Sequence, residues 1–391
     1  MKTQSSDHYT MSPFELSITH ISFTIGAGIL TLPRALVSSL ESSFGWVSIL
    51  FCGLIMAIFV SLIVKLQRRL TKETIFDYFS RSHHLKWLGK LFSVLFFLYF
   101  LAFFAIEGRI LANVVHIYLL DQTPSEVIFL IMLLATTYAC SKGVEGIVHI
   151  SLIYFPFVLL VLGIVVLMNV GNLNINELRP FVATEVIRAF DARNLIYFFL
   201  GFEIFFFWLK YVNPIEPTGK KQKKHKPLVT YLLGVVGIVI LYALVVVFSF
   251  GVLTVEATKI LPFPTIELSK EVEVLEGLIE RLEPLVIVMW IMTIFNTMAI
   301  LQFIASNTFH AQWFKKGNAN IVAFTFGLLS FFIAFSPDSI PESLQMSDWI
   351  GYGGFSVTIL LLIVGFIVVK KSNKTKSGAA IEQQPGREMD G

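Results

Sequence analysis

The sequence predicts an all-α integral membrane protein with ten transmembrane helices, and three observations lead to this fold class. Of the 391 residues, 55% are hydrophobic and only 15% are charged, and the mean hydropathy is +0.74. Two long stretches, 44–64 and 228–255, contain no Asp, Glu, Lys or Arg. Further apolar stretches recur along the chain between charged connections. Because about 20 apolar residues cross the hydrocarbon core of a bilayer as a helix, these stretches predict membrane spans.

The predicted spans follow one another from residue 13 to residue 369. An even number of spans returns the chain to its starting side, so the N-terminus (1–12) and the tail (370–391) should share a compartment. The polar composition of the tail predicts disorder. The approximate bounds of the ten spans are 13–37, 44–65, 88–117, 125–141, 147–169, 189–211, 228–253, 284–305, 318–336 and 347–369.

The distribution of basic residues predicts on which side of the membrane the two termini lie. Most of the 30 lysines and arginines fall at the two termini and in the connections on their side of the membrane. Cytoplasmic connections carry such an excess, so both termini should be cytoplasmic. We interpret the lysine run 220–226 as a topology signal, with binding of anionic lipid as the alternative. On the other side, 256–283 predicts an amphipathic helix that either lies on the bundle or docks a partner.

The first span contains FTIGAGILTLPR over 23–34, in which glycines interrupt a helix at membrane depth. Non-helical backbone is tolerated there only where it lines a cavity or is buried in protein. The two half-helix ends would offer N–H groups to a ligand carboxylate and carbonyls to an ammonium. Close helix packing through small residues is the alternative. The predicted ligand-binding residues are Thr24, Ile25, Gly26, Ala27 and Gly28.

The sixth span places Gly201 and Glu203 among aromatic residues. A carboxylate at this depth costs about 2.5 to 3.5 kcal/mol, so it should face the interior with a partner or water. It is either functional or a structural carboxylate bonded to a neighbouring span. Breaks in spans one and six occupy matching positions of a five-plus-five inverted repeat, about 13–169 and 189–369, and this match favours binding. Leu200 and Phe202 join the predicted site.

Polar residues in two further spans complete the predicted site. Span three contains Tyr99 and Glu107, and Glu107 belongs either to a polar pathway or to a structural salt bridge. Span eight contains Asn296 and Thr297, which suit either interhelical hydrogen bonds or a ligand. We find no phosphate-binding loop, zinc-binding helix, nucleophile elbow or CxxC pair. The sequence therefore predicts no enzyme, no metal site and no cofactor.

Several stretches, taken in order, resemble a known family. They are SPFELSITHISFTIGAGILTLPRAL, FLGFE, FPTIEL, ERLEPLVIVMW and SPDSIPESLQMSDWIGY, and together they span nearly the whole chain. The chain resembles the B subunit of endospore germinant receptors. This spore germination permease family belongs to the amino acid, polyamine and organocation transporter superfamily. The resemblance implies an amino-acid permease-like fold with a central pocket at the broken spans, and it places Tyr99, Glu107 and the Asn296–Thr297 pair at pocket or polar-pathway positions.

The resemblance also implies a location and a role. The protein would reside in the spore inner membrane with an A subunit and a lipoprotein C subunit, bind a small germinant such as an amino acid, and help to trigger germination. Two alternatives stay open. One is a proton-coupled amino-acid transporter in which Glu203 or Glu107 carries the proton, and the other is a conduit for water or ions within the receptor complex.

Overall fold

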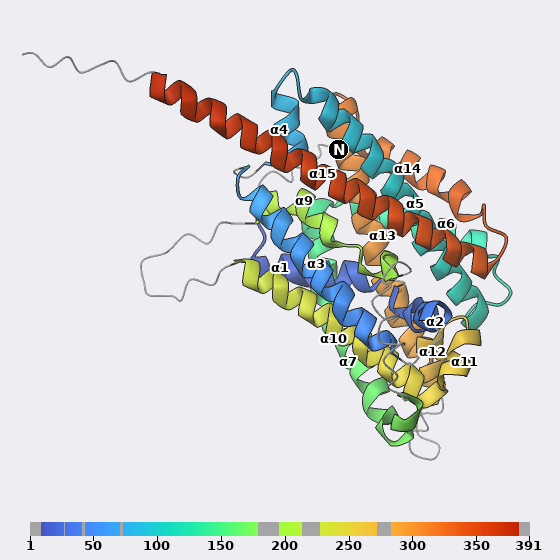
Figure 1. Cartoon of the computed structure of the whole chain (residues 1–391). Coiled ribbons are helices and arrows are strands. Elements are labelled where there is room, and N and C mark those ends of the chain that lie inside the picture. The colour runs from blue at the N-terminus through green and yellow to red at the C-terminus, as the bar shows by residue number, and fades with distance from the viewer. Residues whose placement is uncertain are drawn as a thin grey trace, which may run out of the picture.

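The computed structural model describes residues 9–26, 28–40, 44–70, 73–178, 195–212, 227–271 and 283–382, with side chains described as far as Lys370. The first half contains the helices α1 (Pro13–Ile25), α2 (Gly28–Leu40), α3 (Gly45–Gln67), α4 (Ile75–Arg81), α5 (Lys86–Tyr118), α6 (Ser125–Ser141) and α7 (Gly143–Met168). The second half contains α9 (Phe205–Trp208), α10 (Pro227–Leu253), α11 (Val255–Ile260), α12 (Pro264–Lys270), α13 (Glu283–Trp313), α14 (Ala319–Ala334) and α15 (Ile340–Glu382). They pack into one bundle (Figure 1).

The long apolar helices occupy the predicted spans. Within the described part of the chain, six helices are long and apolar enough to cross a membrane: α3, α5, α7, α10, α13 and α15. The pair α1 and α2 qualifies as one span bent by 52°. Shorter apolar helices, α6 and α14, occupy the predicted fourth and ninth spans, and the broken segment 195–212 occupies part of the sixth. The all-α membrane fold is thereby confirmed, while the count of ten crossings stays a prediction.

Helix contacts pair up as a repeat requires. The central helices α5 and α13 pack on each other, and so do α3 and α10. In the repeat, α5, α6 and α7 of the first half correspond to α13, α14 and α15 of the second. The contact of α6 with α13 is accordingly matched by that of α14 with α5, and the contact of α7 with α13 by that of α15 with α5. The broken segments follow the same rule, because α7 contacts α1 and α15 contacts the 3-10 turn Tyr197–Phe199. This pattern agrees with the predicted five-plus-five arrangement.

The described parts of the connections predicted to be cytoplasmic gather at one end of the bundle, here called the inner end. Met11 N–H donates to the Tyr211 carbonyl (2.8 Å), and the Ser80 hydroxyl of α4 donates to Gln312 Oε1 near the end of α13 (2.7 Å). Helix α15 leaves the bundle on the same side (Figure 1) and continues past residue 369, the predicted end of its span, to Glu382. The lysine run 220–226 lies outside the described residues.

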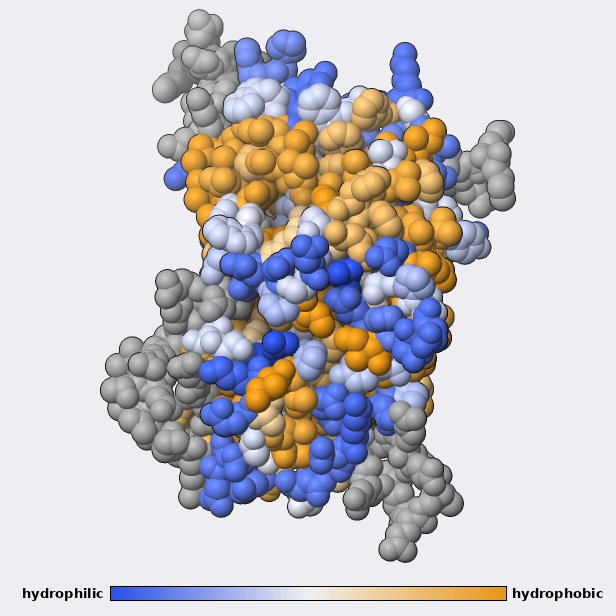
Figure 2. All heavy atoms as spheres, turned by 90° about the vertical axis from the view of Figure 1, so that its right-hand side faces the viewer, coloured by the Kyte–Doolittle hydropathy of each residue, from blue (hydrophilic) through white to orange (hydrophobic). Residues whose placement is uncertain are grey.

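Two short helices cover part of the opposite, outer end. The Thr265 hydroxyl of α12 donates to the Ile29 carbonyl in α2 (2.7 Å), and Tyr118 at the end of α5 donates to Glu267 Oε1 (2.6 Å). Where the sequence predicts one amphipathic helix, α11 and α12 fold separately and pack on the bundle, and 272–282 lies outside the described residues. Figure 2 shows the side where α2, α11 and α12 lie, with hydrophilic residues across its middle and a hydrophobic zone above them.

Candidate ligand site at two helix breaks

The first break separates α1 from α2 at Gly26. The N-terminus of helix α1 is capped by Ser12 and Glu15, which form a reciprocal capping box, and the helix ends at Ile25. A Cβ added to Gly26 would lie 2.8 Å from Glu107 Oε2 and 2.8 Å from Thr297 Oγ1. Glycine therefore lets α5 and α13 bring these polar side chains directly against the broken backbone. Ala27 lies outside the described residues.

The second break lies between Leu200 and Gly201. Leu200 is extended, and Gly201 adopts a φ of 130°, which L-residues rarely take. The Gly201 N–H donates to Glu203 Oε2 (2.7 Å), so a carboxyl group two residues along the chain caps the opened backbone. An added Cβ at Gly201 would collide with Thr24 Oγ1 and lie 3.0 Å from Phe23 Cδ1, which shows that α1 packs tightly on this break.

Two tyrosines hold the two buried carboxyl groups. Tyr99 of α5 donates to Glu203 Oε1 (2.6 Å), and Tyr197 of the second broken segment donates to Glu107 Oε1 (2.8 Å). Glu203 is 0% exposed and Glu107 is 2% exposed. Because burying a carboxyl group is unfavourable without hydrogen bonds, these hydroxyls make both positions tolerable. Helix α5 contributes Tyr99 to one break and Glu107 to the other.

The backbone carbonyls near the breaks also have partners. The Tyr242 hydroxyl of α10 lies 2.7 Å from the Thr24 carbonyl and 3.0 Å from the Phe198 carbonyl, so its one hydrogen is shared between an acceptor beside each break. The Thr297 hydroxyl donates to the Phe23 carbonyl (3.0 Å). The sequence predicts that carbonyls at a half-helix end would receive an ammonium, but in this structure the Tyr242 hydroxyl already binds the carbonyls of Phe198 and Thr24. A ligand would have to replace such partners.

The structure thus brings most of the predicted residues together but separates a few. Gly26, Glu107 and Thr297 meet at the first break, and Thr24, Gly201, Glu203 and Tyr99 meet at the second. The Thr24 Oγ1 is buried and has no hydrogen-bond partner among the described residues. Two others point elsewhere, since Asn296 accepts from Ser151 of α7 (3.1 Å) and Phe202 stacks on Phe59 of α3, whereas Gly28 approaches the Tyr242 hydroxyl that contacts both breaks. Ile25 and Leu200 are buried in the core.

Two tyrosines that the site depends on are not among the residues predicted from the sequence. Tyr197 precedes the second break by four residues, and Tyr242 lies inside the charge-free stretch 228–255. A hydroxyl within an otherwise apolar span is the available signal, because such a group must find a hydrogen-bond partner when buried.

Comparison with known proteins agrees with this architecture. A family model described as spore germination protein matches residues 10–343. Spore germination protein YndE of Bacillus subtilis (strain 168) is 30% identical over 361 residues, covering 90% of this chain and 94% of that protein. A solved Na⁺-coupled sialic acid symporter superposes with a TM-score of 0.66 at 13% identity, covering 93% of this chain and 82% of that chain. The solved structure of MhsT in complex with L-phenylalanine superposes with a TM-score of 0.66 at 14% sequence identity, covering 92% of this chain and 88% of that chain. The solved structures share the transporter fold of this chain.

Proposed function

The chain belongs to the spore germination protein family, and we propose that it is a receptor subunit that binds a small germinant, an amino acid, between the two helix breaks. One observation carries this proposal. The Gly201 amide at the opened helix is bound by the protein's own carboxyl group, Glu203, at 2.7 Å. A free amino acid carries both a carboxylate and an ammonium, so it could take over the amide and pair with the released Glu203 at the same time.

This exchange would couple binding to a change of state. At the second break the protein's own groups bind one another, because Tyr99 and the Gly201 amide both donate to Glu203. A ligand that claims the amide must move Glu203, and Tyr99 on α5 must follow or lose its acceptor. A ligand shifts such an equilibrium by the difference of its affinities for the two states. Helix α5 also holds Glu107 at the first break, so its movement would reach both breaks.

We place the protein in the spore inner membrane with both termini on the cytoplasmic side, together with an A subunit and a lipoprotein C subunit. The gathering of basic connections at the inner end supports the orientation. Copurification from spore membranes with each subunit would test the complex. Amino-acid uptake driven by a pH gradient in proteoliposomes would instead favour the proton-coupled transporter, with the Glu203 carboxyl group as the proton carrier.

The substitution Glu203→Gln tests the binding site. Glutamine keeps the size and an acceptor oxygen for Gly201, but it cannot form an ion pair with an ammonium. We expect the variant to accumulate normally, while the amino-acid concentration needed for binding and for spore germination rises about ten- to a hundredfold. Binding is measured by calorimetry on the purified protein with a panel of amino acids.

The matched control is Glu145→Gln, an exposed carboxylate on α7 at the inner end. It should leave both binding and germination unchanged. A Glu203→Gln protein that binds amino acids and supports germination like the parent would contradict the proposal.

A further inference from the structure

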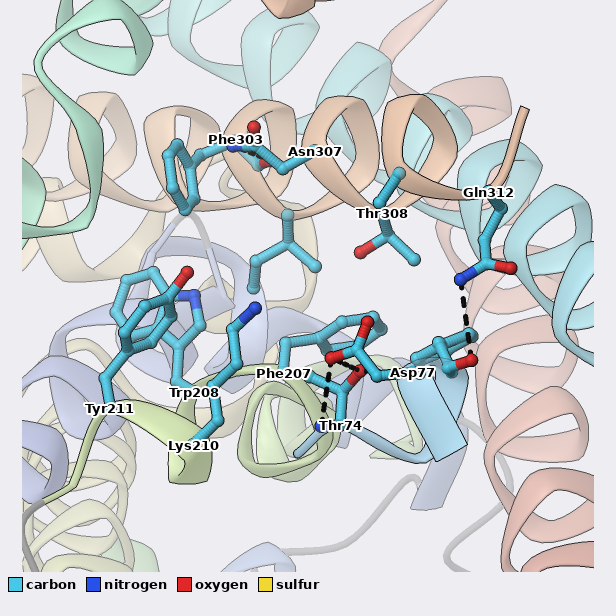
Figure 3. Close-up of a pocket in the computed structure, with 13 residues that line it drawn as sticks. Thr74, Asp77, Phe207, Trp208, Lys210, Tyr211, Phe303, Asn307, Thr308 and Gln312 are labelled. Atoms are coloured by element: carbon cyan, nitrogen blue, oxygen red, sulfur yellow. Dashed lines mark hydrogen bonds between the residues drawn. The ribbon is translucent and has the colours of Figure 1, made fainter. Parts of the chain in front are cut away.

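A cavity lined by both polar and apolar side chains lies at the inner end, away from the helix breaks. Its volume is about 60 Å³, and it lies between α4, the segment 205–211 and the inner part of α13 (Figure 3). Phe207 and Phe303 form part of its apolar wall. The polar side chains that line it are Thr74, Asp77, Trp208, Lys210, Tyr211, Asn307, Thr308 and Gln312.

Opposite charges face this cavity without pairing. Asp77 uses Oδ2 to accept from the Thr74 amide (3.2 Å) and hydroxyl (2.7 Å), and its other oxygen has no hydrogen-bond partner among the described residues. The Lys210 ammonium lies 4.9 Å from the centre of the Tyr211 ring and makes no ion pair within the described part of the chain. Figure 3 shows the lysine nitrogen and the Asp77 carboxyl group on different sides of the cavity.

A buried donor lies on the lysine side. Trp208 is 1% exposed, lines the cavity, and its indole N–H has no acceptor among the described residues. A buried N–H without an acceptor costs about 1 to 3 kcal/mol, and partly buried unpaired charges add to that cost. A group that accepts from Trp208 and pairs with Lys210 would recover it, and a carboxylate does both.

We infer that this cavity is a second binding site, separate from the helix breaks, for a small zwitterionic α-amino acid. The carboxylate would lie at Lys210 and Trp208, and the ammonium at Asp77. A simple anion would leave Asp77 unpaired, and a simple cation would leave Lys210 unpaired. The volume holds about four to six water-sized groups. This space accommodates a ligand of the size of glycine or alanine.

An aromatic barrier divides this inner site from the helix breaks. Phe76 of α4 stacks on Phe207 with ring centres 5.1 Å apart, and Phe96 of α5 meets the Phe207 ring edge-on at 5.4 Å. Glu203 lies four residues before Phe207, and Tyr99 lies three residues after Phe96. The inner site is thus on the inner side of these rings, and binding there does not depend on the function proposed for the breaks.

Protection of a single thiol tests the inner site in the full-length protein in detergent. Thr308→Cys introduces a thiol into the cavity lining, while the native Cys52 and Cys140 are buried. We expect glycine to slow alkylation of this thiol by iodoacetamide. Acetate and methylamine each carry only one of the two charges, so they should need at least about tenfold higher concentrations for the same protection.

Charge variants in the Thr308→Cys background locate the contacts. Lys210→Gln and Asp77→Asn should each raise the glycine concentration for half-protection at least about tenfold, because each removes one ion pair. Lys210→Arg keeps the charge and should retain protection. Lys315→Gln, an exposed lysine at the same end, is the matched control and should change nothing. The alkylation rate without glycine reports whether each variant keeps the cavity.

Three outcomes would overturn the inference: no protection by glycine, equal protection by acetate, or unchanged protection in Lys210→Gln. Glu203→Gln in the same background should leave the protection intact, since it lies beyond the aromatic barrier. Loss of protection in that variant would assign the effect to the helix breaks and would also overturn a separate inner site.

Discussion

The two helix breaks have similar chemistry but are built differently. At the second break the carboxyl group is local, since Glu203 lies two residues from Gly201 and binds its amide. At the first break the carboxyl group is Glu107 from α5, and its tyrosine partner, Tyr197, belongs to the other broken segment. The second break therefore carries its own cap, whereas the first is assembled by tertiary packing. A change at the second break should consequently reach the first, because Tyr197 moves with it.

Tyr242 strengthens this dependence. Its hydroxyl contacts the carbonyl of Thr24 at 2.7 Å and that of Phe198 at 3.0 Å, so one side chain of α10 joins both breaks. The breaks thus form one polar unit held by α5 and α10. Substitutions within this unit measure how much each break contributes to stability and how strongly the two breaks are coupled.

The largest difference between the breaks should come from their glycines. Gly201→Ala places a Cβ against Thr24 Oγ1 and forces an L-residue to a φ of 130°, so we expect a loss of about 3 kcal/mol or failure to accumulate. Gly26→Ala brings its Cβ to 2.8 Å from Glu107 Oε2 and Thr297 Oγ1 but forces no L-residue to a positive φ, so it should cost less. Thermal unfolding in detergent, followed by size-exclusion chromatography, ranks the variants.

Gly163→Ala is the control for both glycine variants, because no described atom beyond its own stretch of α7 lies within 4 Å of its added Cβ. It should unfold at or slightly above the temperature of the parent. A Gly201→Ala protein as stable as Gly163→Ala would show that the second break does not depend on its backbone conformation.

An intermediate effect is expected from Tyr242→Phe. The substitution removes the one hydroxyl hydrogen that two buried carbonyls share, one at each break, and we expect a loss of about 2 kcal/mol. Tyr138→Phe, with a 64% exposed side chain, should change the stability by less than about 0.5 kcal/mol and serves as the control. The free energy of unfolding is measured by titrating mixed micelles with SDS. Equal stabilities of the two variants would mean that the breaks are not joined through α10.

Much of this architecture is predictable from local sequence features. The long apolar stretches predict the bundle, and glycine within such a stretch predicts both breaks because backbone at membrane depth must be satisfied. Glu203 stands out for the same reason, since a carboxyl group among phenylalanines needs partners. The family resemblance, confirmed by the match over residues 10–343, predicts the fold around them.

The partners themselves could not be predicted. Tyr242 binds carbonyls that lie 218 and 44 residues away in the chain, and no spacing rule connects them. The inner cavity was missed because Asp77 lies in a connection and Lys210 at the end of the predicted sixth span, where charged residues are ordinarily explained by solvation and topology. Helix packing determines which donor and which acceptor form each hydrogen bond. Sequence patterns indicate the need for a partner but not its identity.

The smallest expected effects test whether the two carboxyl groups respond together. Tyr99→Phe removes one donor to Glu203, which keeps its bond to Gly201, so we expect a loss of about 1 kcal/mol. Tyr197→Phe removes a donor to Glu107 and should cost a similar amount. The same SDS titration measures both variants.

Combining Tyr99→Phe with Tyr197→Phe tests whether the two breaks are coupled. Both pairs include a residue of α5, and Phe103 of that helix lies between the tyrosines, with ring centres 5.9 Å from Tyr99 and 5.2 Å from Tyr197. If the breaks form one unit, the second substitution acts on a site already loosened. The combined loss should then differ from the sum of the single losses by at least about 0.5 kcal/mol. Strict additivity would instead mean that each break holds its carboxyl group independently, and binding at one would not be transmitted to the other through α5.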